Sequence, residues 1–348
     1  MYESDTSTVT DALKSANSTV FSDATINAIL ALTTRANDPK VTFTEAAPDA
    51  NGNVTVSAGA EVVLVNSSDT NQTEVRPPAN APVVIFQGRG GVVATLNDAA
   101  ATVPSSNQSQ VDRVVVGSAG NDIIIVQDAK NTQIILGTGD SSVTTGYGVD
   151  TVQAGLGNST IVGGSGDYAV VKLAGSPANY QVTVNNGHAI VTNQTSNKTT
   201  DISKIQYVQL DNGNALVFAK NSVEAAVSTL YHTAFGRDAD AGGLDYWFDL
   251  ARAGATLNQI ADAFTHSAEF APQAALSNND FVQDLYQNTF GRAGENSGVA
   301  YWTDALANGA TRADLVTSFS QIGAQNIAET IHTEAQIVGS VTIVTGII

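Results

Sequence analysis

The sequence contains no cysteine, and only 14% of its 348 residues are charged. A chain without cysteine has no disulfides, no zinc–thiolate site and no cysteine nucleophile. The few charges are mostly acidic, with 33 Asp and Glu against 15 Lys and Arg and a net charge of -18. This shortage of basic residues argues against nucleic acid and anionic lipid as partners, because both are bound by basic surfaces.

Long hydrophobic runs are also missing. No apolar stretch approaches the roughly 20 residues of a membrane-spanning helix, so we expect no membrane span. The first residues, MYESDTSTVTDALKSANST, have neither a basic n-region nor an apolar h-region. The sequence therefore predicts no N-terminal signal peptide, and an exported chain would need its address elsewhere.

The sequence lacks recognisable catalytic motifs. It has no G-x-S-x-G elbow and no H-E-x-x-H, and the Gly88–Gly91 stretch GRGG lacks the ending of a phosphate-binding loop. Its histidines are scattered, at His188, His232, His266 and His332. We therefore expect a protein that is not an enzyme.

What the sequence does contain is a nine-residue repeat. Cut every nine residues, Gly137–Lys172 reads GTGDSSVTT GYGVDTVQA GLGNSTIVG GSGDYAVVK. Valine or isoleucine occupies seven positions nine residues apart, namely Val116, Ile125, Ile134, Val143, Val152, Ile161 and Val170. One inward-facing β-branched residue in each nine-residue half-coil is typical of a parallel β-solenoid. The alternative is a Gly-rich meander with accidental spacing.

Short runs of β-forming residues surround this repeat. They include NVTVSA, EVVLVN, APVVIF, DRVVVG, NDIIIV, TQIILG, YQVTVNN and HAIVTN. We predict strands at all of them, within a β-rich domain over residues 41–220 whose solenoid covers 116–172. Residues 1–40 read as a Ser/Thr-rich helical segment in which Ser22 is a candidate N-cap.

A second repeat follows, with a period of 55 residues. Leu230–His266 aligns without gaps to Leu285–Gln321, and both segments show helical periodicity between glycines. We predict an all-α tandem repeat over residues 221–335 and an apolar tail over 336–348. In this reading Arg237 and Arg292 are buried and bond helix C-terminal carbonyls, and Trp247 and Trp302 are core anchors. The fold class is therefore β plus α, a β-roll followed by helices.

Both repeats resemble known bacterial families. GSAGNDIII (Gly117–Ile125) and GYGVDTV (Gly146–Val152) resemble the RTX nonapeptide, GGxGxDxUx, of type I-secreted proteins. YHTAFGR with GLDYW, and then YQNTFGR with GVAYW, resemble the bacterial domain of unknown function 4214. Such helical modules accompany RTX-like segments in surface-layer, adhesin and matrix proteins. The resemblance implies an extracellular or cell-surface protein, exported by type I secretion machinery through an uncleaved C-terminal signal.

The RTX resemblance implies Ca²⁺ as a candidate cofactor, because Asp and turn carbonyls of the nonapeptide bind that ion between stacked turns. The candidate ligands in the solenoid turns are Asp122, Asp140, Asp150, Asn158 and Asp167. Most of them lie one residue out of the family register, and the alternative is that they cap tight turns. Asp238 and Asp240 open an EF-hand-like count, for which the favoured reading is a helix N-cap.

These observations favour a secreted structural protein that self-assembles into a surface layer or an extracellular filament of a biofilm matrix. Polymerisation would proceed by sheet-edge stacking, or by strand addition through the apolar tail. The candidate assembly residues are Val341, Ile343, Val344, Ile347 and Ile348. The alternative is a calcium-binding adhesin or glycan-binding surface protein, and a secreted hydrolase is a third hypothesis.

Overall fold

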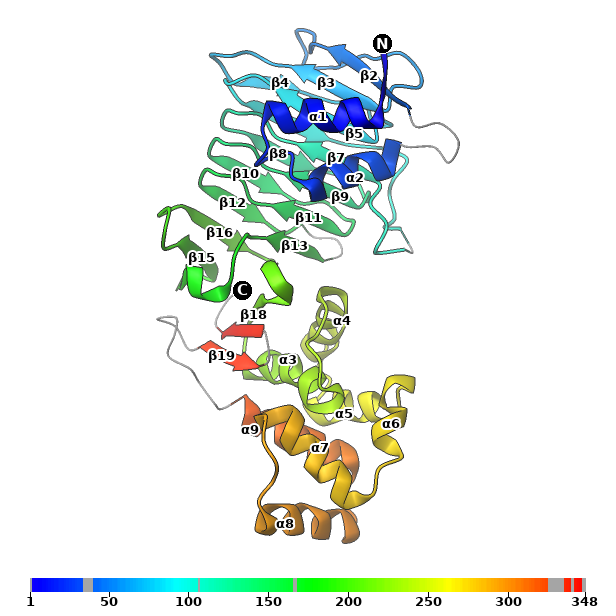
Figure 1. Cartoon of the computed structure of the whole chain (residues 1–348), viewed down its shortest axis with the longest axis vertical. Coiled ribbons are helices and arrows are strands. Elements are labelled where there is room, and N and C mark those ends of the chain that lie inside the picture. The colour runs from blue at the N-terminus through cyan, green and yellow to red at the C-terminus, as the bar shows by residue number, and fades with distance from the viewer. Residues whose placement is uncertain are drawn as a thin grey trace. The chain divides into compact units, whose positions relative to one another are not determined.

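The computed structural model describes residues 2–33, 40–105, 107–164, 168–324, 335–338 and 341–345. The chain divides into two compact units, residues 1–174 with 188–205 and residues 175–187 with 206–348. The first unit is rich in strands and the second in helices (Figure 1). Among the described residues no helix has the length and apolar character to cross a membrane.

The first unit is built from two sheets whose strands are almost all parallel. The first sheet contains, in spatial order, β1 (Tyr2–Asp5), β2 (Lys40–Ala46), β3 (Val62–Asn66), β5 (Val83–Gln87), β7 (Arg113–Val116), β9 (Thr132–Ile135), β11 (Asp150–Gln153) and β13 (Ala169–Lys172). The second sheet contains β4 (Thr73–Val75), β6 (Val92–Leu96), β8 (Ile123–Val126), β10 (Ser141–Thr144), β12 (Ser159–Val162), β16 (Thr199–Ser203) and β15 (His188–Asn193). From β4 to β13 the chain alternates between the sheets, which confirms the predicted β-roll.

The β-branched ladder lies between the two sheets and is fully buried. Its members are Val115, Ile124, Ile134, Val143, Val152, Ile161 and Val171, which pair in register within each sheet. The predicted period of nine is right from Ile134 to Ile161. It is wrong at Val116, Ile125 and Val170, because the steps before Ile134 and after Ile161 are ten residues long. One extra residue moves a strand's whole inward set to the opposite face.

The N-terminal helices cover the outer face of the first sheet. Helices α1 (Thr6–Ala16) and α2 (Asp23–Thr33) share a core with residues of β2, β3, β5, β7 and β9. Ile29 is fully buried in this core, and Val116 lies there instead of between the sheets. The Ser22 hydroxyl accepts the Thr25 N–H at 3.3 Å, which confirms the predicted N-cap.

One predicted strand does not form. Within residues 53–58 only Asn53 makes a bridge, to Arg76. The Asp49 carboxylate accepts the backbone N–H groups of Asn51 and Asn53 at 2.8 and 2.9 Å. The Asp49 side chain therefore takes the first amide of the predicted strand, and the Val54 N–H bonds the Arg76 carbonyl at 3.1 Å.

The second unit packs helices against a few strands. Its first elements are a 3-10 turn (Pro177–Asn179), β14 (Tyr180–Asn185), β17 (Tyr207–Gln209), a second 3-10 turn (Asp211–Gly213) and β18 (Ala215–Ala219). The helices are α3 (Ser222–Phe235), α4 (Ala241–Arg252), α5 (Leu257–Thr265), α6 (Ala271–Ala274, after a 3-10 turn at Ala268–Phe270), α7 (Asn278–Phe290), α8 (Asn296–Ala307) and α9 (Arg312–Gly323). Two further strands, β19 (Ala335–Val338) and β20 (Val341–Thr345), follow them.

The 55-residue repeat is visible in the helices and their caps. Helices α3, α4 and α5 correspond to α7, α8 and α9. Gly236 and Gly291 end the first helix of each repeat in the left-handed conformation, with φ 65° and 66°. Thr256 and Thr311 begin the third helix of each repeat with a capping box. Both repeats contribute to one hydrophobic core.

Candidate functional site

Two of the candidate calcium ligands point into the solenoid. The Asp122 side chain accepts the N–H groups of Val92 and Ser118 at 3.0 and 2.8 Å, and the Ser118 hydroxyl at 2.6 Å. The Asp150 carboxylate accepts the N–H groups of Thr132 and Gly146 at 2.8 and 2.6 Å. Both residues are buried, and desolvation raises the pKa of each, that of Asp150 to about 7.

Two others form a column along one exposed turn edge. The Asn121 side chain accepts the Asp140 N–H at 2.9 Å, and the Asp140 carboxylate accepts the Asn158 N–H at 2.7 Å. The Asn158 side chain in turn accepts the Thr199 N–H at 3.1 Å. These hydrogen bonds, chiefly from the Asn158 backbone, lower the pKa of Asp140. The fifth candidate, Asp167, lies outside the described residues.

These placements do not fit the calcium site of the RTX pattern. Ca²⁺ takes six to eight oxygen ligands. Here the carboxylate oxygens face backbone N–H groups, which repel a cation, and Asp122 and Asp150 belong to opposite sheets. In the described part of the chain no three His, Cys, Asp or Glu side chains gather where they could hold a metal. The interaction that these residues make is the capping of turns.

The two candidate calcium ligands in the helical region, Asp238 and Asp240, make other interactions. Asp240 is the N-cap of α4 and accepts the Gly243 N–H at 2.8 Å. Asp238 lies 3.7 Å from the His232 ring nitrogen Nδ1. Asp240 also lies 3.8 Å from the Arg237 guanidinium, which supplies positive charge where an EF-hand needs oxygen ligands.

The solenoid interior contains an ion pair that the sequence did not reveal. The Arg113 guanidinium donates two hydrogen bonds to the Asp128 carboxylate, both at 2.9 Å, and a third to the Thr132 hydroxyl at 2.9 Å. The two charged side chains are 2% and 0% exposed. Arg113, Thr132 and Asp150 occupy one column of neighbouring strands, so the core carries a polar stripe across three coils.

The four middle strands of the second sheet have a neutral outer face, which Glu74 on β4 and Asp201 on β16 border on either side. Strands β6, β8, β10 and β12 place eight side chains there, in two in-register columns: Val93, Ile123, Ser142 and Thr160, and Thr95, Ile125, Thr144 and Val162. All eight are half-buried or exposed, and none is charged. The first sheet differs, because α1 and α2 cover its outer face.

The C-terminal strand pairs within its own chain. Strand β20 lies parallel to β18 and antiparallel to β19. Ile343 is fully buried in the helical core. Ile347 and Ile348 lie outside the described residues, and for Val341 and Val344 the structure describes the backbone only. The predicted strand therefore exists, with hydrogen-bonded neighbours on both sides.

Each helical repeat has the same aromatic cluster. The Trp247 Nε1–H donates a hydrogen bond to the Tyr231 hydroxyl at 3.1 Å. The same hydroxyl lies against Gly243, where the Cβ of any other residue would be only 2.3 Å away. Tyr286 and Gly298 repeat this packing at the same distance. Trp247 and Trp302 pack against the core, as expected.

The prediction of buried arginines is wrong. The side chains of Arg237 and Arg292 are 42% and 52% exposed and form ion pairs with Glu269 and Glu295, both at 2.6 Å. Each guanidinium lies over the aromatic rings of its own repeat. Because the preceding glycine ends the helix in the left-handed conformation and its N–H already bonds a carbonyl, the arginine is directed across the cluster surface instead.

Comparison with known proteins agrees with this repeat. The family described as Domain of unknown function (DUF4214) matches residues 218–274 and 261–323. Residues 218–323 are a tandem of DUF4214 domains. The repeated caps and the Tyr–Gly–Trp packing are the structural content of this tandem. No curated protein and no solved structure matches the chain.

The DUF4214 tandem also exposes one tyrosine per repeat. Tyr246 and Tyr301 are 58% and 67% exposed and occupy equivalent positions, 55 residues apart. Each packs edge-on against its neighbouring tryptophan, with ring centroids 4.8 and 5.0 Å apart. Sequence reasoning singled out the tryptophans and missed these tyrosines, although the aligned repeats contain both.

Proposed function

We propose that this chain is a secreted bacterial structural protein, without enzymatic activity, that self-assembles into a surface layer or extracellular filament. The observation that carries the proposal is the neutral outer face of the second sheet. Helices α1 and α2 cover β2, β3, β5, β7 and β9 of the first sheet, whereas the middle strands of the second sheet present an uncharged face suited to a second copy. Residual RTX-like character supports export by type I machinery.

Charge explains why two copies would meet at this face. Each chain carries a net charge of -18, so most of its surface repels another copy. The eight side chains of the face are uncharged and include Thr, Val and Ile, which tolerate burial on a pleated surface. Sheets with such faces pack about 10 Å apart, with side chains interdigitating.

The C-terminal strands are a weaker place for the contact. Strand β20 already has β18 on one side and β19 on the other, so strand addition would require these pairs to open first. The β1 edge of the first sheet is also protected, because β1 is short and carries Glu3 and Asp5. Short, charged edges oppose sheet-edge stacking.

The test uses two threonines nine residues apart. Thr160 on β12 points outward from the second sheet, and Thr151 on β11 points outward from the first. Sedimentation and negative-stain microscopy of the full chain should show assemblies for the wild type and for Thr151→Glu. Thr160→Glu should sediment as a monomer, since a buried unpaired carboxylate opposes the contact. Wild-type protein that stays monomeric, or equal behaviour of the two variants, would overturn the proposal.

A second candidate function is glycan binding by the DUF4214 tandem. Exposed Tyr246 and Tyr301 offer two flat rings on equivalent positions, which suits stacking of a repeating sugar. A glycan screen of the wild type against Tyr246→Ala/Tyr301→Ala tests it. Binding that vanishes in the double variant supports an adhesin, and the absence of any hit excludes this reading.

A further inference from the structure

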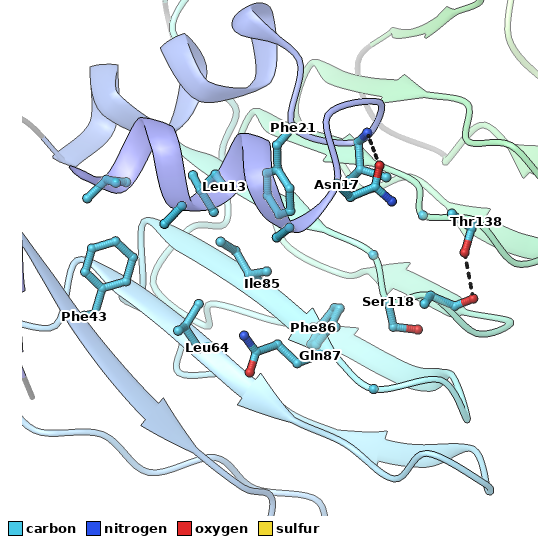
Figure 2. Close-up of a pocket in the computed structure, with 18 of the residues that line it drawn as sticks. Leu13, Asn17, Phe21, Phe43, Leu64, Ile85, Phe86, Gln87, Ser118 and Thr138 are labelled. Atoms are coloured by element: carbon cyan, nitrogen blue, oxygen red, sulfur yellow. Dashed lines mark hydrogen bonds between the residues drawn. The ribbon is translucent and has the colours of Figure 1, made fainter. Parts of the chain in front are cut away.

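A cavity of about 410 Å³ lies between helix α1 and the outer face of the first sheet (Figure 2). Its sheet side is formed by Phe43, Leu64 and Ile85, from β2, β3 and β5. Leu13 from α1 and Phe21 from the turn after it close the helix side. This volume falls within the range of pockets that hold small organic ligands.

The cavity exists because α1 presents short side chains to the sheet. Ala12 and Ala16 line it from the helix and remain exposed, so the cavity is open to solvent beside them, and Val9 is the residue that α1 buries. A helix packed directly on a sheet would present larger apolar residues at these positions. The cavity therefore follows from the small side chains in the sequence of α1.

One end of the cavity is polar. Figure 2 shows Asn17, Thr138 and Ser118 on one side of the apolar group, with Gln87 at its lower edge. The side-chain oxygen Oδ1 of Asn17 accepts hydrogen bonds from the N–H groups of Thr19 and Val20 at 3.1 and 3.2 Å. That bonding fixes the amide, so its Nδ2 faces away from these two groups and supplies hydrogen-bond donors.

Among the residues that the structure describes, the lining contains no charged side chain, although the chain has a net charge of -18. The charged residues of α1, Asp11 and Lys14, are exposed and lie outside the lining. A charged ligand would lose its hydration there without gaining a counter-charge, whereas an apolar body gains from contact with Leu64 and Ile85.

We propose that this cavity binds a neutral amphiphile. Its apolar chain or ring lies over Leu64 and Ile85, and an uncharged ester, alcohol or amide head hydrogen-bonds to the end formed by Asn17, Gln87 and Thr138. This site is independent of self-association, because it lies on the opposite sheet from the neutral face. Its test can therefore fail without affecting the proposed assembly.

The experiment is a titration of the full chain with the neutral fluorophore N-phenyl-1-naphthylamine, followed by displacement with 1-decanoylglycerol or with decanoate. We expect saturable binding of one fluorophore per chain, and displacement by the glyceride at concentrations at least about tenfold lower than by the carboxylate. No saturable binding, or equal displacement by both compounds, would overturn the proposal.

Matched variants locate the site. Ala12→Phe fills the cavity from α1 and should weaken fluorophore binding by about tenfold or more. Ser15→Phe puts the same ring on an exposed position of α1 outside the lining and should leave binding within about twofold. Far-UV circular dichroism verifies that both variants fold. Equal affinities of the two would place the binding elsewhere.

A milder variant tests the polar end without filling space. Gln87→Leu removes an exposed amide and should weaken displacement by 1-decanoylglycerol about twofold to tenfold, the value of one hydrogen bond, while fluorophore affinity is unchanged. An unchanged glyceride affinity would remove Gln87 from the head-binding end, and an equal loss for both compounds would contradict the assigned orientation.

Discussion

The buried ion pair between Arg113 and Asp128 offers the most direct test of the solenoid interior. Replacing Asp128 by Asn leaves an arginine that is 2% exposed without the carboxylate that it is hydrogen-bonded to. Removing one partner of a buried pair lowers the free energy of unfolding by about 3–5 kcal/mol, because the remaining charge stays desolvated. The control is Asp23→Asn, which breaks an ion pair with Lys14 whose side chains are 81% and 45% exposed. Such a surface pair contributes about 1 kcal/mol or less.

The assay is urea unfolding followed by two signals. Both tryptophans, Trp247 and Trp302, belong to the second unit, so their fluorescence reports that unit. Far-UV circular dichroism reports the strands as well. Asp128→Asn should lower the circular-dichroism midpoint of the first unit by about 1–2 M urea and leave the fluorescence midpoint in place. A cost no greater than that of Asp23→Asn would refute the claim that this charge pair lies in a dry core.

Three further predictions concern other parts of the chain. Burial raises the pKa of Asp150 to about 7, above the value of 3.8 for the free group, so the folded state keeps this proton longer. The free energy of unfolding should therefore fall by about 3 kcal/mol between pH 4 and pH 7. The Asp150→Asn variant should lose this pH dependence when urea unfolding is repeated across that range. Gly291→Ala should lower the free energy of unfolding by about 1–2 kcal/mol, because this residue has a left-handed φ. Gly236→Ala should lower it further, because its Cβ would also lie 2.9 Å from the Asn288 side chain. Thermal unfolding followed by fluorescence ranks the two variants, and the reverse order would contradict the cap geometry. Ile343→Ala should lower the stability of the second unit by about 2–5 kcal/mol, and an unchanged fluorescence midpoint would mean that β20 does not dock on the helical core.

The architecture could be predicted from the sequence because both repeats have periods that only certain structures satisfy. A β-branched residue every nine positions fits one strand per half-coil, and a 55-residue repeat with amphipathic runs fits a helical tandem. The register of the solenoid strands was harder to predict. The ladder steps from Ile124 to Ile134 and from Ile161 to Val171 are ten residues long, and no local signal in the turn sequences marks the extra residue. A one-residue change reverses the buried face, so Val116 was assigned to the wrong side of its sheet.

The candidate sites were harder to predict for a different reason. Asp and Asn occupy solenoid turns in either case, as metal ligands or as caps, and only the direction of the backbone N–H groups around Asp122 and Asp150 separates these roles. Besides the N-terminal residues, the cavity beneath α1 depends on five strand and turn regions far apart in the chain, with Leu64 and Thr138 among them. No periodicity connects those positions, so the sequence alone does not reveal the cavity.

The coil repeat bears on how this protein changes length over evolutionary time. Val143 pairs with Ile161, eighteen residues later, and each coil adds one strand spacing of about 4.8 Å to the stack. An in-frame duplication of eighteen codons therefore lengthens the unit by a fixed step and recreates contacts that already exist. The stripe from Arg113 to Asp150 is different, since its buried hydrogen bonds and ion pair connect particular residues of successive coils. Insertions are expected to accumulate on either side of that stripe and to leave the stripe itself intact.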